Sequence, residues 1–245
     1  MLLNGCGVNK TVLEEIVEQV YTVEPDANIS IHNQDGAILV YGSDVNEVRV
    51  RSLKRAYSQE RLNQIAVDIS TRPGGVSIIT KFPSQPNWAF SDHSGTVDCT
   101  VVLPATASIS ALDLHAGEIL LDSMRGSEVR ARLHDGRIFA RNCLTNLDLT
   151  TNRGTLTLAY DWWEQKKFSA QVNVGQGNAW IFLPSDARFH LLAHAARGSI
   201  SNDFNNVPLT ANSSMNIDQM INSGGLATIE VRVDKGDIKI GEANP

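Results

Sequence analysis

The chain has 245 residues, of which 42% are hydrophobic and 20% are charged, and its formal net charge is −6. Charges of both signs are interspersed, which excludes the basic surface that nucleic-acid-binding proteins need. No segment approaches the roughly 20 consecutive apolar residues of a membrane-spanning helix. The composition is that of a folded chain, and the length suits a single all-β domain.

We interpret residues 1–24 as an N-terminal leader and cap. Residues 2–6, with the sequence LLNGC, resemble the end of a bacterial lipoprotein signal, in which a small residue precedes the acylated cysteine. Asn4 departs from that pattern, and the charged and apolar regions that would precede it are missing. Cys6 is therefore a candidate lipidation site, with an unmodified thiol as the alternative. Residues 8–24 combine helical spacing of apolar residues with many β-branched ones, so their secondary structure stays open.

From residue 25 onward, a short glycine-centred pattern recurs. Its seven copies centre on Gly36, Gly117, Gly136, Gly154, Gly177, Gly198 and Gly236. Successive glycines from Gly117 to Gly198 are 19, 18, 23 and 21 residues apart. A repeat of about 20 residues built from strand-like segments is typical of a β-solenoid, which stacks one coil per repeat.

Both sides of each glycine alternate between apolar and polar residues. The apolar positions lie five and three residues before the glycine and two and four residues after it, as Leu112, Leu114, Ile119 and Leu121 illustrate around Gly117. Each copy is therefore strand, turn, strand, with a turn that favours a residue lacking Cβ. The fold class is all-β, a single-stranded β-helix, with a sandwich or barrel of hairpins as the alternative.

Two glycine intervals are longer than one period. Gly36 and Gly117 are 81 residues apart, near four periods, and Gly198 and Gly236 are 38 apart, near two. The periodicity predicts additional coils inside both intervals and a stack of about ten coils.

The solenoid domain is expected to span residues 25–245, with three loop excursions. Residues 81–95 are rich in proline and aromatic residues, residues 160–168 lengthen one repeat to 23 residues, and residues 203–226 are rich in Asn, Ser and Gly. Residues 81–95 are read as an irregular insertion, the extra length at 160–168 predicts a loop that bulges outward, and residues 203–226 lack strand alternation, which predicts a long loop.

Few residues suggest catalysis or metal binding. His190 and His194 have the spacing of a zinc-binding helix, but on a strand they would lie about 13 Å apart, too far to share an ion. His115 and His134 each stand two residues before a repeat glycine, so they are expected to stack on adjacent coils. No nucleophile elbow, phosphate-binding loop or Cys/His pair is present.

A polysaccharide lyase or hydrolase on a β-helix would need paired or calcium-binding carboxylates in a groove. The candidate acids are Asp113, Glu118, Asp135, Asp148 and Asp161. We interpret Asp113, Arg132 and Asp148 as one column in which the cation separates two anions, a structural arrangement. The sequence therefore favours a protein that is not an enzyme.

Trp162 and Trp163 are the best binding candidates. Exposed aromatic side chains stack on sugar rings or anchor protein interfaces. In the alternative, one tryptophan covers the core while the other lies on the flank. Cys99 and Cys143 are expected to be buried thiols, with a disulfide as the alternative if their coils bring them close enough.

Several features in order resemble the bacterial putative-adhesin domain family of unknown function. They include DGAI at residues 35–38, strands that end in Leu-Pro at 103–104 and 183–184, RGSISNDF at 197–204, and KGDIKI at 235–240. The similarity extends over about residues 22–241. It implies a right-handed β-helix-like solenoid and an envelope or surface location, and it implies no catalytic residue.

The sequence thus predicts a non-catalytic structural or interaction module of the bacterial cell envelope, either periplasmic or on the surface. No cofactor, metal or nucleic acid is expected, and the membrane is contacted only through a lipid anchor at Cys6. The expected partner is an envelope glycan or a surface protein, and the oligomeric state is open. The alternative function is a carbohydrate-binding or carbohydrate-processing envelope protein that uses Trp162 and Trp163.

Overall fold

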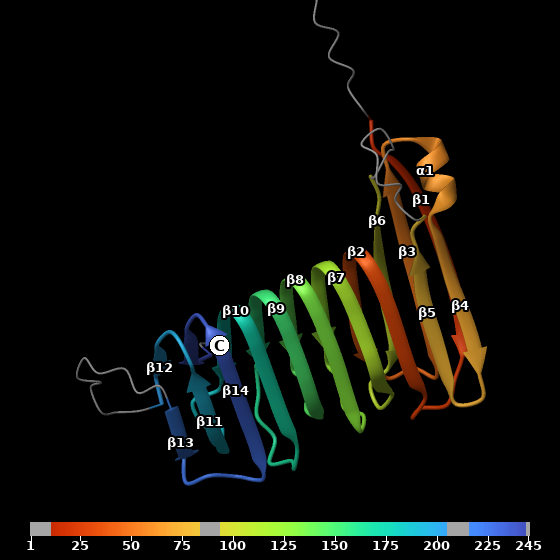
Figure 1. The fold of residues 1–245 in the computed structure, drawn as a ribbon. Helices are drawn as coiled ribbons and strands as arrows, with labels where there is room; N and C mark the ends of the chain where they lie inside the picture. The colour runs from red at the N-terminus through yellow and green to blue at the C-terminus, as the bar shows by residue number, and fades with distance from the viewer. Residues whose placement is uncertain (1–10, 84–93, 205–215, 244–245) are drawn as a thin grey trace, which may run out of the picture.

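A computed structural model describes residues 11–83, 94–204 and 216–243, and this part of the chain forms fifteen strands and one short helix (Figure 1). The elements are β1 (Leu13–Thr22), β2 (Asn28–Ser43), β3 (Glu47–Ala56), α1 (Gln59–Gln64), β4 (Ala66–Arg72), β5 (Gly75–Lys81), β6 (Thr96–Pro104), β7 (Ser108–Asp122), β8 (Glu128–Arg141), β9 (Asn146–Ala159), β10 (Ser169–Leu183), β11 (Phe189–Ala195), β12 (Ile200–Asn202), β13 (Asn216–Ile221), β14 (Ala227–Lys235) and β15 (Ile238–Glu242).

Five long strands, β2, β7, β8, β9 and β10, lie parallel and in register, and each bends at its repeat glycine (Figure 1). The segments before the bends form a first wall, in the order β4-β5-β2-β7-β8-β9-β10-β14-β11-β13. The segments after the bends form a second wall, in the order β1-β3-β6-β2-β7-β8-β9-β10-β15-β12. The all-β prediction is confirmed, while the handedness of the stack stays a prediction.

The glycines form a continuous ladder, but their spatial order differs from the sequence order. Gly36 pairs directly with Gly117, so no coil lies between them. The intervening chain instead runs to the outer side of β2, where β5 and β6 pair with it. The prediction of coils between Gly36 and Gly117 is therefore wrong, because the parallel rung that this interval adds, β5 with β6, lies on the far side of β2.

At the C-terminal end of the stack, too, the spatial order of the glycines differs from their order in the sequence. A Cβ atom built on Gly236 would lie 1.8 Å from the carbonyl oxygen of Gly177, and one built on Gly198 would lie 1.8 Å from that of Gly236. The rung of β14 and β15 therefore sits between β10 and the rung of β11 and β12. Within the described ranges the ladder has seven glycine rungs, and strands that lack the repeat glycine widen each wall to ten strands.

Antiparallel strands end the parallel stack. At the N-terminal end, β1 pairs with β3, β3 with β6, and β4 with β5, all antiparallel. The capping segment expected in residues 1–24 thus contains a strand from 13 to 22. At the other end β13 pairs antiparallel with β11, so residues 216–221 are a strand where the sequence predicts a loop.

The core fills the space between the walls. Alternate residues of every rung are buried, and they form one cluster of Ile, Leu, Val and Ala side chains along the stack. Polar residues at core positions are hydrogen bonded: Asn33 Nδ2 donates to the carbonyl oxygen of Val97 at 2.7 Å, and Thr151 Oγ1 donates to that of Arg153 at 3.3 Å. Buried polar groups need such partners because they have lost water.

Candidate functional site

The two adjacent tryptophans, which lie between β9 and β10, occupy different environments. Trp163 turns inward, with ring-centroid distances of 5.4 Å to Tyr160, 5.7 Å to Phe168 and 5.8 Å to Phe189. Trp162 turns outward and is 43% exposed. They do not form one aromatic platform, and the side chain that is open to a ligand is Trp162.

An ion pair flanks Trp162. Its indole Nε1 donates to Glu164 at 3.3 Å, and the two terminal nitrogens of Arg125 donate to the same carboxylate at 2.7 and 3.1 Å. The hydrogen bond from Arg125 is the main cause that lowers the pKa of Glu164 below its ordinary value. Lys166 Nζ, which donates to the carbonyl oxygen of Leu144 at 2.9 Å, anchors the same segment. Trp162 therefore stands beside a salt-bridged surface, and its role in ligand binding is a proposal.

Two of the three cysteines, Cys99 and Cys143, lie among the residues that the structure describes. Cys6, the candidate lipidation site, lies outside the described residues. Cys99 and Cys143 are free and buried. Burial raises the pKa of Cys99 to about 11 and that of Cys143 to about 12, because the thiolate loses its hydration.

We expect Cys99 and Cys143 to resist alkylation in the folded protein. The thiolate is the reactive form, and both accessibility and the raised pKa oppose it at neutral pH. Treatment with iodoacetamide at pH 8, followed by peptide mass spectrometry, should find both sites unmodified before unfolding and both modified in guanidinium. Rapid modification of either site in the folded chain would contradict its buried position.

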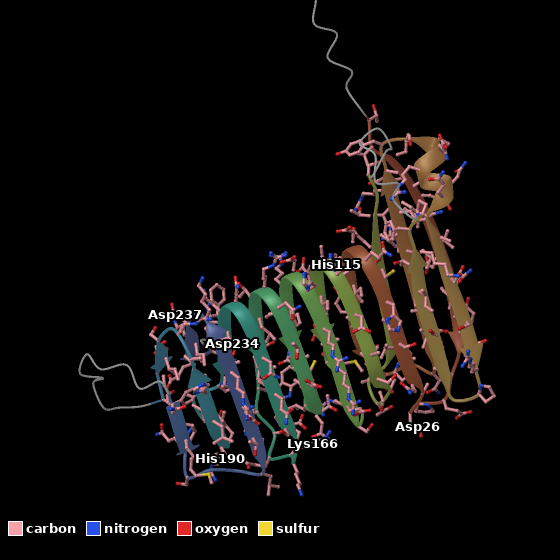
Figure 2. The ribbon with its side chains drawn as sticks, in the orientation of Figure 1. Asp26, His115, Lys166, His190, Asp234 and Asp237 are labelled. Atoms are coloured by element: carbon pink, nitrogen blue, oxygen red, sulfur yellow. The ribbon has the colours of Figure 1, made fainter. Side chains whose placement is uncertain are left out.

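A polar groove on the first wall was not anticipated from the sequence. It has a volume of about 460 Å³ and is lined by residues of β5, β2, β7, β8 and β9. The residues that line it are His32, Asn33, Gln34, Thr80, Asp113, Leu114, His115, Arg132, Leu133, His134, Thr150 and Asn152. In Figure 2, His115 lies near the bent edge and Lys166 at the opposite edge. The lining of the groove includes no residue of 160–168, the segment that holds Trp162.

The expected histidine stack is confirmed inside this groove. The rings of His115 and His134 lie 4.8 Å apart between centroids and are nearly parallel, with an interplanar angle of 8°. Asn152 Nδ2 lies 2.8 Å from Nδ1 of His134, which extends the polar contacts to a third strand. The stack follows from the register, because Gly117 and Gly136 pair and the residues two positions before them are neighbours.

The charges of the groove are only partly compensated. Asp113 pairs with His32 at 3.0 Å rather than with Arg132, its neighbour in the register. Thr150 is the next residue of that column, whereas Asp148 lies beside Arg130. The predicted column of Asp113, Arg132 and Asp148 is therefore wrong.

Two carboxylates at the bent edge differ in environment. Partial burial raises the pKa of Asp35, and the nearby His115 opposes that rise. The hydrogen bond from Arg153 is the main cause that lowers the pKa of Asp135. The edge thus carries both a compensated and a less solvated acid.

The two histidines of β11 make separate polar contacts within the described ranges. His190 and His194 lie on β11, where His190 Nε2 is 2.6 Å from Asp218 and His194 Nδ1 is 2.5 Å from Asn216. Residues 11–83, 94–204 and 216–243 contain no group of three or more His, Cys, Asp or Glu residues arranged for a metal ion. Among these residues, no helix has the length and apolar character to cross a membrane.

A clostridial structure shares the fold of this chain. A structure of a putative cell adhesion protein from Clostridium sporogenes aligns with a TM-score of 0.53 and 12% identity, over 94% of this chain and 100% of that one. A putative adhesin from Bacteroides fragilis aligns at 10% identity with a TM-score of 0.30, over 94% and 97% of the two chains. No curated protein matched the sequence. The model of the family described as Toastrack DUF4097 matches residues 19–241, and the chain belongs to that family.

Proposed function

We propose that this protein is a non-catalytic interaction module of the bacterial cell envelope, in which a stiff β-stack holds binding surfaces in fixed positions. The observation that carries the proposal is the parallel pairing of β2, β7, β8, β9 and β10, which stays in register around the repeat glycines and shifts only near Ile29 and Ile109. Each of these strands is paired on both sides. Such a stack aligns outward side chains in columns and changes shape little when a partner binds.

Exposed ion pairs between rungs support the same role. Arg137 contacts Glu118 at 2.7 Å, Arg141 contacts Asp161 at 2.7 Å, and Arg153 contacts Asp135. Each links one rung to the next, and although each contributes little stability alone, together they restrain the side chains of the bent edge and of the turns.

The similarity of the fold to a clostridial protein described as a putative cell adhesion protein is the reason to place the module at the envelope. The partner in this proposal is an envelope glycan or a surface protein. Lipid attachment through Cys6 is the part of the proposal that would hold the module at the membrane. Trp162, exposed beside the pair of Arg125 and Glu164, provides one contact surface.

The test is the location of the native gene product and its effect on attachment. We expect the protein in the envelope fraction of the bacterium that encodes it, and we expect deletion of the gene to lower attachment of the cells to glycan-coated or protein-coated surfaces. Complementation with the native gene should restore attachment, and a Cys6→Ala copy should release the protein from the membrane. Recovery with cytoplasmic markers, or unchanged attachment, would overturn the proposal.

A further inference from the structure

We propose that the polar groove of the first wall binds an acidic polysaccharide, with Arg132 as the residue that contacts a sugar carboxylate. This inference deepens the proposed interaction role, because it names the class of ligand and the surface that takes it. The groove is lined mainly by outward side chains of β2, β7, β8 and β9, with Thr80 of β5 at one end.

The shape of the groove suits an extended polymer. Outward residues four and two positions before each glycine stand as two parallel rows, about 7 Å apart along the strand, because side chains on one face repeat every second residue. The backbone of the residue between them forms the floor, as at Leu114 and Leu133, whose side chains are buried in the core. Four neighbouring strands give the rows a length of about 14 Å, which fits a short oligosaccharide rather than a single small molecule.

The chemistry of the two rows suits a sugar that carries both hydroxyl groups and a carboxylate. Thr150, Asn152 and Gln34 supply hydroxyl and amide groups, which donate to and accept from sugar hydroxyls. The stacked rings of His115 and His134 add further polar edges and a flat surface. The groove is open to solvent, unlike the enclosed pockets that bury most of a lipid or an aromatic ligand.

The position of Arg132 is the reason to propose an acidic ligand. Its side chain is exposed in the groove, and among the described residues it has no hydrogen-bond or ion-pair partner. Its neighbour in the column, Asp113, is engaged by His32. A guanidinium group binds carboxylates through two parallel hydrogen bonds, so an unpaired arginine between amide and hydroxyl side chains is placed to receive one.

The net charge of −6 argues against a general polyanion as the ligand. A polymer that binds through charge alone needs a broad basic surface, whereas this groove combines one unpaired arginine with the carboxylates of Asp113, Asp35 and Asp135 nearby. Recognition must therefore combine one carboxylate contact with hydrogen bonds to hydroxyl groups. A uronic-acid polymer has both on each sugar.

The test is isothermal titration of the full chain with oligogalacturonate, and with the same oligomer after reduction of its carboxyl groups to neutral alcohols. We expect the acidic oligomer to bind and the reduced oligomer to bind at least about tenfold more weakly, a loss of about 1.4 kcal/mol. Arg132→Gln should weaken binding of the acidic oligomer by a similar factor and leave the reduced oligomer unchanged. Asn152→Ala should weaken both oligomers.

The matched control is Arg130→Gln. Arg130 lies on the same strand two residues away, is exposed, and pairs with Glu128 at 2.9 Å outside the groove. We expect it to change the affinity by less than about twofold, since exposed ion pairs contribute little. Equal losses in the two arginine variants, equal binding of both oligomers, or no binding by the native chain would overturn the proposal. Envelope location and attachment are measured separately, so failure here leaves the proposed function standing.

Discussion

Gly136→Ala should destabilise the protein by about 3 kcal/mol, the largest loss that we expect from adding a single methyl group. Gly136 has a φ of 133°, a conformation that residues with a Cβ rarely adopt. A Cβ atom at this position would lie 1.9 Å from the carbonyl oxygen of Gly117 on the neighbouring rung. The rungs would have to separate, which would weaken the hydrogen bonds of β7 with β8.

The matched control for this prediction is Gly74→Ala. Gly74 also has a positive φ, 79°, but no atom lies within 4 Å of the position its Cβ would take. The substitution therefore incurs backbone strain without a clash, and we expect a loss of about 1 kcal/mol. Thermal unfolding should show a decrease of about 9 °C for Gly136→Ala and about 3 °C for Gly74→Ala. Similar decreases would mean that backbone conformation alone, and not the close approach of rungs, selects glycine.

Trp163→Ala should have the second-largest effect, a loss of about 2 to 3 kcal/mol. The indole contacts Tyr160, Phe168 and Phe189, and Tyr160 is fully buried with its hydroxyl donating to the carbonyl oxygen of Cys143 at 2.9 Å. Removing the ring leaves a cavity between the segment after β9 and the start of β11. Chemical denaturation monitored by circular dichroism measures this loss directly.

Two further variants test whether the packing of the Trp163 ring provides this stability. One removes only the polar group of Trp163, and the other removes only the neighbouring ring of Trp162. The Nε1 atom of Trp163 is buried and has no hydrogen-bond partner among the residues that the structure describes. Trp163→Phe should therefore retain most of the stability, since it removes an unsatisfied donor while keeping an aromatic ring. Trp162→Ala should change the unfolding free energy by less than about 0.5 kcal/mol, because Trp162 is exposed. A large loss in Trp162→Ala would contradict the assignment of the outward and inward rings.

These different roles also change how ligand binding by the tryptophans is tested. A double substitution would combine a folding defect with any loss of a contact surface. Trp162→Ala alone leaves the aromatic cluster of Trp163 intact, so a loss of binding in that variant reports on the surface beside Glu164.

The residues that form each glycine rung, and which of them are buried, could be predicted from the sequence. Apolar residues on both sides of the glycine predicted the buried positions, and Ile119 and Leu121 on β7 and Ile138 on β8 are buried as expected. The pattern was informative because strand alternation and the turn are local properties, fixed by residues within a few positions of Gly117 or Gly136. The stacking of His115 on His134 followed from the same register.

The order of the rungs was decided by tertiary structure. The rung of Gly236 lies between those of Gly177 and Gly198, and Gly36 lies next to Gly117, although the intervals along the chain predicted otherwise. Pairing between strands is a non-local contact, and a free strand edge accepts any segment whose alternation matches. Chain length between two glycines therefore does not report how many rungs separate them.

Side-chain environments that depend on contacts with distant segments could also not be predicted from the sequence. Trp162 and Trp163 are adjacent in the chain, and only contact with Phe189, from a later strand, shows which ring is buried. The groove around Arg132 combines residues of five strands, and Asp113, the neighbour of Arg132 in the register, contacts His32 instead. Local sequence determined the shape of each coil, whereas pairing between coils determined the surfaces, because a surface is made by neighbours that the chain brings together only on folding.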